Sequence, residues 1–564
     1  MTKLLKDLNS QQIAAVQHTE GPCLIVAGPG SGKTRVLTHR AAYLIQQNLA
    51  APEEILLVTF TNKSADEMKE RVHKLLQEHF PKDVPPLPWV GTFHATGAKI
   101  LRRDGREIEV SPNFVIYDEA DSQRLIKKIL KKLDIPEEEL RPGAVLGTIE
   151  SAKHELIDAA SYQNYAYGPF QNQVARIYPE YQKNLQENGA LDFGDLIFKT
   201  VELLQLHPEV LKKWRDRFRY ILVDEYQDTN RAQYTLVKLL AEKHRNLCVV
   251  GDVSQAIYGW RGADFKNVLN FEKDWPEVKI FRLEQNYRST ETIVRAAKEV
   301  IEHNRTHIAL NLRTENALGE KIKIYEAKDE QDEARQVVRE IRDIEISGDQ
   351  NTDFAILYRT NAQSRVLEET LVREGLSYQL IGGVKFYDRR EIKDILSYLR
   401  VIANPRDRLS LERIINIPPR GIGKKSQEKL AARNWNLADV AKILEFPLQE
   451  FINRRETLVP LETMDKILEQ TGYLGWLDDG SEENLARIEN VKELRSVAAQ
   501  FENLQNFLEN VALVQNGYTP KGKLPASTRP ERSPELAEGR SRRVTLMTLH
   551  AAKGLEFPAV FIVG

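Results

Sequence analysis

The sequence predicts an α/β fold in which parallel strands alternate with helices. Three segments support this prediction, because each passes from an apolar run into a polar loop: "CLIVAGPGSGKT", "YILVDEYQD" and "LCVVGDVSQ". Short apolar runs without alternation are typical of strands that are buried on both faces of a parallel sheet. Polar residues directly after such strands gather at the carboxyl edge of the sheet, where α/β proteins bind their ligands.

The first segment has the pattern of a phosphate-binding loop, with an apolar run before it and a helical pattern after it. Its glycines allow backbone N–H groups to surround phosphate oxygens. Lys33 places a positive charge near the β- and γ-phosphates, and Thr34 can hold Mg²⁺. A glycine-rich turn that only opens a helix is the alternative. The pattern predicts ATP and Mg²⁺ as cofactors, bound by Ala27, Gly28, Pro29, Gly30, Ser31, Gly32, Lys33 and Thr34.

The second segment places two carboxylates after an apolar strand predicted at 220–223. Asp224 is positioned to complete the Mg²⁺ shell. Glu225 can orient and deprotonate the water that attacks the γ-phosphate. Acidic residues after a strand are by themselves compatible with a solvated turn, but the phosphate loop upstream favours the catalytic interpretation.

The third segment continues into an aromatic-rich loop, "QAIYGWRGAD". Gln255 is suited to sense the γ-phosphate, while Tyr258, Trp260 and Arg261 have flat faces that can stack on nucleic-acid bases. One loop would thus contact both ligands. The alternative is that these aromatic side chains belong to the hydrophobic core.

Composition restricts the class of protein without identifying a partner. The 564 residues include 80 basic and 82 acidic side chains, so a net charge of -2 does not by itself indicate nucleic acid. No apolar run approaches the length that spans a bilayer, and no secretory signal is visible. We therefore expect a cytoplasmic protein that uses no membrane. Cys23 and Cys248 lie in apolar stretches, which favours strand positions over a disulfide or a metal site.

The order of the motifs is more specific than any one of them. Together they closely resemble the UvrD/PcrA/Rep group of superfamily 1 DNA helicases, from Leu8 to Gly564. The resemblance implies an α/β fold with two RecA-like parallel-sheet motor domains of the P-loop NTPase class, each with a mainly helical insertion. The matching segments are "LNSQQ", "AGPGSGKT", "VTFTNKSADEM", "GTFHATGAKILRR", "VDEYQD", "VGDVSQAIYGWRGA", "LEQNYRST", "ILYRTNAQSR", "GGVKFYDRREIKD" and "LMTLHAAKGLEF".

The resemblance also implies domain boundaries. Helix periodicity in "SQRLIKKILKKL", with Leu125, Ile129 and Leu133 on one face, supports a helical first insertion. "KIKIYEA" and "FAILYRT" are expected to be strands of the second motor domain. The expected parts are 1–110 and 191–282 for the first motor domain (1A), 111–190 for its insertion (1B), 283–385 and 544–564 for the second, incomplete motor domain (2A), and 386–543 for its insertion (2B), with a flexible linker at 519–543.

Residue roles follow from the same resemblance. Gln12 would contact adenine, Tyr287 would stack on it with Arg35 nearby, Arg288 would act as an arginine finger, and Glu556 would face the nucleotide. The implied DNA contacts use aromatic, amide and basic groups, which suit single strands without base-specific recognition. For His94 and His550, a hydrogen-bonded core histidine is the alternative. The implied DNA-binding residues are Phe60, Thr61, Asn62, Phe93, His94, Tyr258, Trp260, Arg261, Tyr358, Arg359, Asn361 and His550.

The implied function is an ATP-dependent 3′ to 5′ helicase or translocase on single-stranded DNA and DNA junctions. Repair or replication restart is the implied setting, with repair or replication proteins as candidate partners, and the oligomeric state stays open. In the family, a further motif with a second arginine finger follows "VFIVG" and does not occur here. We therefore expect slow hydrolysis and poor unwinding. The competing hypothesis is a truncated DNA- and ATP-binding remnant or regulatory subunit with little turnover.

Overall fold

The computed structural model contains two compact units. The first is drawn from Met1–Ala27, Lys33–Leu283 and Phe386–Gly517, and the second from Gly28–Gly32, Glu284–Lys385 and Tyr518–Gly564. Each unit is described here by itself. The residues that the structure describes are 3–77, 80, 84–137, 139–259, 262–304, 308–346, 352–360, 363–381, 386–433, 435–478, 482–516 and 544–564.

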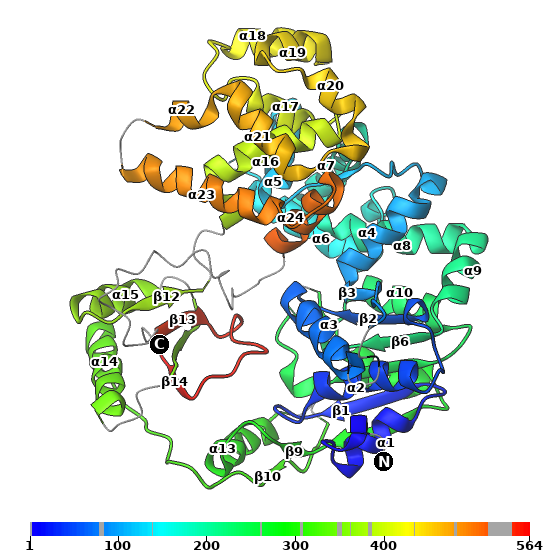
Figure 1. Cartoon of the computed structure of the whole chain (residues 1–564), viewed down its shortest axis with the longest axis vertical. Coiled ribbons are helices and arrows are strands. Elements are labelled where there is room, and N and C mark those ends of the chain that lie inside the picture. Colours follow the sequence, from blue (N-terminus) through cyan, green and yellow to red (C-terminus); the bar gives the residue numbers. More distant parts are fainter. Residues whose placement is uncertain are drawn as a thin grey trace. The chain divides into compact units, whose positions relative to one another are not determined.

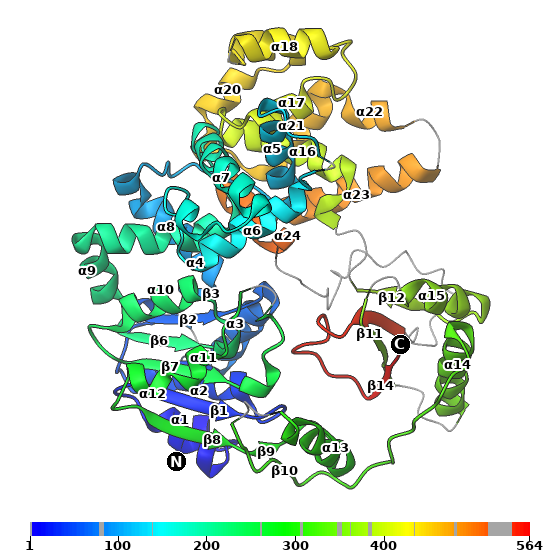
Figure 2. The same ribbon diagram turned by 180° about the vertical axis from the view of Figure 1, so that it is seen from behind.

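The first unit contains a six-stranded parallel sheet, in the order β3-β2-β6-β7-β1-β8 (Figures 1 and 2). Every residue of β1, β2, β6 and β7 is buried, as expected for strands covered on both faces. Cys23 and Cys248 are register partners on β1 and β7, and both are free cysteines. The strands are β1 (Cys23–Ala27), β2 (Ile55–Thr59), β3 (Val90–Thr92), β6 (Tyr220–Val223), β7 (Leu247–Gly251) and β8 (Lys279–Leu283).

Helices connect these strands, and most begin with a recognisable cap. Asn9 and Gln12 form a reciprocal capping box at the start of α1, and Thr92 accepts a hydrogen bond from the Ala95 N–H at the start of α4. The helices are α1 (Ser10–Gln17), α2 (Lys33–Gln46), α3 (Asn62–Gln77), α4 (Phe93–Asp104), α8 (Phe193–Leu206), α9 (Pro208–Arg217), α10 (Arg231–Ala241), α11 (Lys266–Leu269) and α12 (Phe271–Asp274).

Two helical regions extend the first unit, one from the segment between α4 and α8 and one from residues 386–516. Each region has its own hydrophobic core. The first consists of α5 (Glu119–Lys132), α6 (Pro142–His154), α7 (Pro169–Glu187) and the two-residue strands β4 (Val115–Ile116) and β5 (Ala190–Leu191). The second consists of α16 (Arg390–Ala403), α17 (Arg408–Ile414), α18 (Lys424–Ala432), α19 (Leu437–Leu444), α20 (Leu448–Asn453), α21 (Pro460–Thr471), α22 (Tyr473–Leu477), α23 (Glu482–Ala498) and α24 (Leu504–Asn516).

Buried polar contacts join the two helical regions where α5 lies beside α16 and α17 (Figures 1 and 2). The Tyr117 hydroxyl donates to Asp407 Oδ1 at 2.8 Å. Arg400 Nη1 lies 2.5 Å from Asp121 Oδ2. Because removing one partner of a buried ion pair leaves an uncompensated charge, these contacts fix the register between the regions.

A smaller parallel sheet, in the order β12-β13-β11-β14, forms the second unit together with the pair β9 and β10. β11 is fully buried, whereas β14 lies at an edge and alternates between half-buried and exposed residues. The elements are β9 (Gln285–Asn286), β10 (Arg313–Thr314), β11 (Phe354–Tyr358), β12 (Tyr378–Leu380), β13 (Val544–Thr548), β14 (Ala559–Ile562), α13 (Glu291–Glu302), α14 (Glu330–Ile346) and α15 (Ser364–Arg373).

These observations confirm the predicted α/β class with parallel sheets, and they correct two local predictions. "FAILY" is a strand, but "KIKIYEA" is not, because Ile322 and Ile324 are 55% and 94% exposed and no described strand pairs with them. Helix α5 ends at Lys132, so Leu133 is its C-cap rather than a member of the helix. The predicted linker at 519–543 lies outside the described residues. None of the described helices has the length and apolar composition needed to cross a bilayer.

Candidate nucleotide and DNA site

The carboxyl ends of β1, β6 and β7 bring the predicted catalytic side chains together in the first unit. Lys33 begins α2 shortly after β1, Glu225 follows β6, and Gln255 follows β7. Lys33 Nζ donates to Glu225 Oε2 at 3.3 Å and to Gln255 Oε1 at 2.9 Å. Residues that are far apart in the sequence therefore meet as the parallel topology predicts.

Two further side chains close this contact into a polar ring. Gln255 Nε2 donates to Asp252 Oδ2 at 2.5 Å, and the Asp252 N–H donates to Gln227 Oε1 at 3.0 Å. Gln227 Nε2 then donates to Glu225 Oε2 at 2.5 Å. Sequence reasoning did not identify Gln227 or Asp252, although both stand inside the motifs that it used. The polar ring, defined as Lys33, Glu225, Gln227, Asp252 and Gln255, links two strand ends through side chains and the backbone N–H of Asp252.

Asp224 and Thr34 form the side of the site suited to a divalent cation. The Thr34 hydroxyl donates to Asp224 Oδ2 at 3.1 Å, and the Asp224 side chain is buried. Burial, followed by the negative charge of Glu225, raises the pKa of the Asp224 carboxyl to about 7, although Lys33 and Thr34 oppose the shift. A hydroxyl and a carboxylate are hard oxygen ligands of the kind that Mg²⁺ prefers, so the donor set fits this metal.

Glu225 adopts an unusual backbone conformation, with φ of 52° in the left-handed region. A non-glycine residue in this region costs about 1 kcal/mol or more, and such residues are frequent at functional sites. Its backbone N–H donates to the Asp224 carboxylate at 3.0 Å. The turn directs two consecutive acidic side chains toward different partners, Asp224 toward Thr34 and Glu225 toward Lys33.

The glycine-rich loop contacts β9, and its residues Gly28–Gly32 belong to the second unit with that strand. Gly30 has φ of +67°, and a Cβ atom there would lie 2.7 Å from the Asn286 amide, so glycine is required. The Asn286 amide donates to the Pro29 carbonyl at 2.7 Å, and the Tyr287 N–H donates to the Gly30 carbonyl at 2.9 Å. Asn286 is a third residue that sequence reasoning did not identify.

The other predicted nucleotide contacts occupy defined positions. Arg288 Nε lies 2.5 Å from Glu556 Oε2, and Tyr287 is 45% exposed. Gln12 is buried in the first turn of α1, and its side-chain oxygen accepts from the Asn9 N–H at 3.0 Å. Arg35 is half-buried in the first turn of α2.

The predicted DNA-binding residues of the first unit follow β2 and β3. Phe60 and Phe93 meet edge to face at 5.7 Å, but only Phe60 is half-exposed, since Phe93 is 2% exposed. This geometry offers the Phe60 ring for base stacking and makes Phe93 a support beneath it. Thr61 caps α3 by accepting from the Ser64 N–H at 3.1 Å, and Asn62 is half-buried in the first turn of that helix.

His94 and the loop after β7 complete this group. The His94 ring packs 5.3 Å from Phe193, and burial lowers the pKa of His94 to about 4. His94 is therefore neutral near pH 7 and cannot supply a cation for phosphate. Tyr258 is half-buried, while Trp260 and Arg261 lie outside the described residues.

In the second unit, one of the predicted DNA-binding residues is buried and two others lie at the surface. Tyr358 is fully buried in β11, and burial raises the pKa of its hydroxyl to about 12. Its ring belongs to the core, so the predicted stacking role does not fit this position. Arg359 Nη1 donates to His550 Nδ1 at 3.0 Å, and this pair offers polar groups at the surface. Asn361 lies outside the described residues.

Comparison with known proteins gives consistent matches over both halves of the chain. The UvrD/REP helicase N-terminal domain model matches residues 8–276, and the UvrD-like helicase C-terminal domain model matches residues 281–564. Two similar proteins, each named ATP-dependent DNA helicase PcrA, come from Staphylococcus epidermidis and Staphylococcus aureus. Each is 46% identical over 594 aligned residues, which cover 100% of this chain and 78% of the relative.

The raised pKa of Asp224 predicts how stability depends on pH. The folded-state pKa of about 7 exceeds the ordinary value of 3.8, so the folded chain binds this proton more tightly than the unfolded chain. The contribution of the Asp224 carboxyl to the free energy of unfolding is fully present below pH 3.8 and is lost as the pH rises through about 7. The Asp224→Asn variant has no titrating carboxyl at this position, so its stability does not decrease with pH in this way. The unfolding free energy of the wild type minus that of the variant should fall by about 2 kcal/mol between about pH 5 and pH 8.

Denaturant unfolding without nucleotide or Mg²⁺ at both pH values measures this difference. A difference that does not change with pH would show that Asp224 titrates normally.

Proposed function

Because the chain belongs to the UvrD/REP helicase family, we propose that its polar ring couples ATP hydrolysis to 3′ to 5′ movement along single-stranded DNA. The chain is an ATP-dependent DNA helicase built on two RecA-like domains with helical insertions. The observation that carries the proposal is the contact of Lys33 with both Glu225 and Gln255. One cation thereby connects the hydrolytic carboxylate to the loop that leads toward Tyr258.

Binding of ATP requires Lys33 to exchange its partners. Without nucleotide, Glu225 neutralises the Lys33 ammonium, whose side chain is only 10% exposed. The β- and γ-phosphates would replace this carboxylate, while the loop N–H groups surround their oxygens. Thr34 and Asp224 would hold Mg²⁺, which neutralises charge on the phosphates. Glu225 is released by the exchange and becomes available as a base.

Glu225 is the residue that we assign to activating water. Its side chain is 21% exposed, so water reaches it, and Gln227 holds its Oε2 in place. A positioned carboxylate that accepts the proton of attacking water contributes about 10² to 10⁴-fold to the rate. Arg288, restrained by Glu556, would supply positive charge to the γ-phosphate in the transition state.

Gln255 offers a route from the γ-phosphate to DNA. Its side chain contacts Lys33 and Asp252, and the segment that it begins continues to Tyr258. Loss of the γ-phosphate would change the contacts of Gln255 and thereby the loop that carries Tyr258, Trp260 and Arg261. Alternating grip on a strand by two motor domains requires a link of this kind.

The proposal also covers the domain bounds, the surface that contacts DNA and the cellular setting. The motor domains comprise 1–110 with 191–282 and 283–385 with 544–564, and the insertions are 111–190 and 386–543. Groups at the surface such as half-exposed Phe60 and the pair of exposed Arg359 with His550 would contact single strands and junctions without base specificity. We place the activity in the cytoplasm, in repair or replication, where proteins of those pathways would recruit it.

The direction of movement provides the test of this function. A duplex with a 3′ single-stranded tail should be unwound in the presence of ATP and Mg²⁺ faster than the same duplex with a 5′ tail. The reason is that a 3′ to 5′ motor loaded on a 3′ tail moves toward the duplex. Strand displacement of the two substrates by the same protein measures the ratio. Equal rates, or faster unwinding from the 5′ tail, would contradict the proposed polarity, and no unwinding would favour the remnant hypothesis.

Glu225→Gln should separate nucleotide binding from hydrolysis. The amide keeps the size of the side chain but cannot accept the proton from water, so turnover should fall at least about 10²-fold. Affinity for ATP should stay unchanged or rise, because the carboxylate that competes for Lys33 is removed. Steady-state hydrolysis and equilibrium binding of ATP measure the two effects. Exposed Glu272→Gln on α12 serves as the matched control. Equal loss of binding and turnover in Glu225→Gln would contradict the assigned role.

A further inference from the structure

Two tryptophans lie side by side at the amino edge of the first sheet. Trp89 directly precedes β3, and Trp214 lies in α9, three residues before that helix ends at Arg217 and the chain turns toward β6. Their rings meet edge to face at 5.2 Å, and the two side chains are 3% and 0% exposed. Both indoles are therefore covered, and the residues that cover them decide what this surface presents to solvent.

Three cations gather around the Trp89 ring. Lys99 Nζ, Arg103 Cζ and Arg217 Cζ lie 5.6, 5.1 and 5.8 Å from its centroid. Both guanidinium groups also lie within 6 Å of the Trp214 ring, at 5.9 and 5.7 Å. The electron-rich face of an indole attracts cations at such distances. The aromatic pair thus holds three like charges close together in a defined arrangement.

Acidic side chains such as Glu509 and Asp104 lie near this surface, but none of the described ones forms an ion pair with the three cations. Lys99 Nζ donates to the Pro88 carbonyl at 3.1 Å. Lys99 and Arg103 are exposed and Arg217 is half-buried, yet none forms an ion pair, whereas neighbouring Lys213 lies 2.6 Å from Asp104. Partial burial lowers the pKa of Lys99; the negative charge of Glu509 opposes this shift, while the charges of Lys69 and Arg103 add to it. Mutual repulsion makes such a cluster unfavourable in the free protein, and an anion would relieve it.

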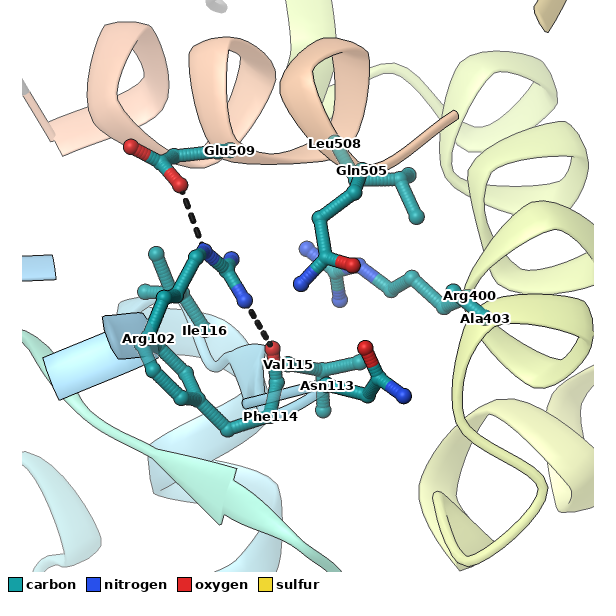
Figure 3. A pocket seen from close by; sticks show the side chains of 10 residues that line it. All are labelled: Arg102, Asn113, Phe114, Val115, Ile116, Arg400, Ala403, Gln505, Leu508 and Glu509. Carbon is teal, nitrogen blue, oxygen red and sulfur yellow. Dashed lines mark hydrogen bonds and ion pairs between the residues drawn. The ribbon is translucent and has the colours of Figure 1, made fainter. Parts of the chain in front are cut away.

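The cluster is separate from the carboxyl-edge site. Lys99 and Arg103 are one turn apart on α4, which begins at Phe93 near the predicted DNA contacts. At 1.5 Å per residue, Arg103 lies about 15 Å along the helix from that end. Arg102, the adjacent residue, faces another way, toward a cavity of about 20 Å³, and donates to Glu509 at 2.6 Å (Figure 3). Arg102 is therefore engaged with Glu509 and does not belong to the group of cations around Trp89.

We propose that Lys99, Arg103 and Arg217, the cation cluster, bind the sugar-phosphate backbone of a DNA segment other than the strand held at the carboxyl edge. Guanidinium groups match phosphate oxygens in a two-pronged geometry, which favours phosphate over other anions. The covered indoles cannot stack on bases, so the surface recognises backbone charge without sequence preference. The inference rests on the proposed function only for the identity of the polyanion.

The test compares two DNA probes on three proteins. The probes are a single strand of about 10 nucleotides and a forked duplex with a single-stranded tail. The proteins are the wild type, a variant with Lys99→Gln, Arg103→Gln and Arg217→Gln, and a control with Lys74→Gln, Lys132→Gln and Lys238→Gln. The control lysines are exposed and each is paired with a carboxylate, so the same charge is removed outside the cluster.

The short strand should bind all three proteins equally. The fork should bind the cluster variant about 10-fold more weakly than the wild type or the control at low salt. The slope of log affinity against log salt concentration should decrease by about 2 to 3, since about three phosphate contacts are lost. Equal fork affinities and slopes for all three proteins would overturn the proposal. If the wild type did not bind the short strand at all, this result would instead contradict the proposed function.

Two further measurements distinguish the proposal from misfolding of the variant and from binding of a different partner. A second variant with Arg103→Lys and Arg217→Lys keeps the charges and should regain most of the fork affinity. A fork affinity no higher than that of the glutamine variant would show that positive charge at these positions does not bind the fork, and it would overturn the proposal. Forked DNA should also protect Lys99 of the wild type from acylation, measured by mass spectrometry. Protection by polyglutamate but not by the fork would indicate an acidic protein partner and overturn the assignment to DNA.

Discussion

The contact of the Lys33 ammonium with Glu225 and Gln255 is the interaction on which the rest of the site depends. A largely buried cation is costly unless it is paired, and here its partners come from the ends of two different strands. The parallel register of β1, β7 and β6 places those strand ends at one edge. Site geometry therefore follows directly from sheet topology, and exchange of Lys33 from carboxylate to phosphate changes the contacts of both strand ends together.

The organisation of the helical regions follows a different principle. Each has its own apolar core, but buried polar groups, such as Tyr117 with Asp407, join them. Apolar burial fixes each region internally, whereas directional hydrogen bonds and ion pairs fix how the two regions meet. The same division holds at the amino edge of the sheet, where aromatic packing buries Trp89 and Trp214 and the cations above them remain available.

Local signals in the sequence were sufficient to predict the strands that carry the site. Apolar runs such as 220–223, followed by Asp224 and Glu225, combine strand propensity with ligand chemistry in a few residues, so their assignment needs no tertiary information. The glycine-rich loop was predictable for the same reason. The motif order supplied the family, which the domain models confirm.

Tertiary packing determines which of the predicted residues are buried and which further residues join the site, and the sequence alone does not show this. Phe93 and Tyr358 carry ring types suited to stacking, but only the fold shows that both rings are buried. Gln227 and Asp252 become part of the site because the Gln227 side chain accepts from the Asp252 backbone N–H and so bridges two strand ends, which no local pattern reveals. "KIKIYEA" has strand composition, yet a strand forms only beside a hydrogen-bonding neighbour.

Steady-state ATP hydrolysis with and without single-stranded DNA measures the proposed coupling, because the polar ring joins the hydrolytic carboxylate to the DNA-binding loop. We expect a saturable increase in the rate on addition of single-stranded DNA, and we expect Lys33→Ala to abolish this increase. A wild-type rate that does not respond to DNA would show that the ring does not couple the two ligands, as would a DNA-dependent increase that persists in Lys33→Ala.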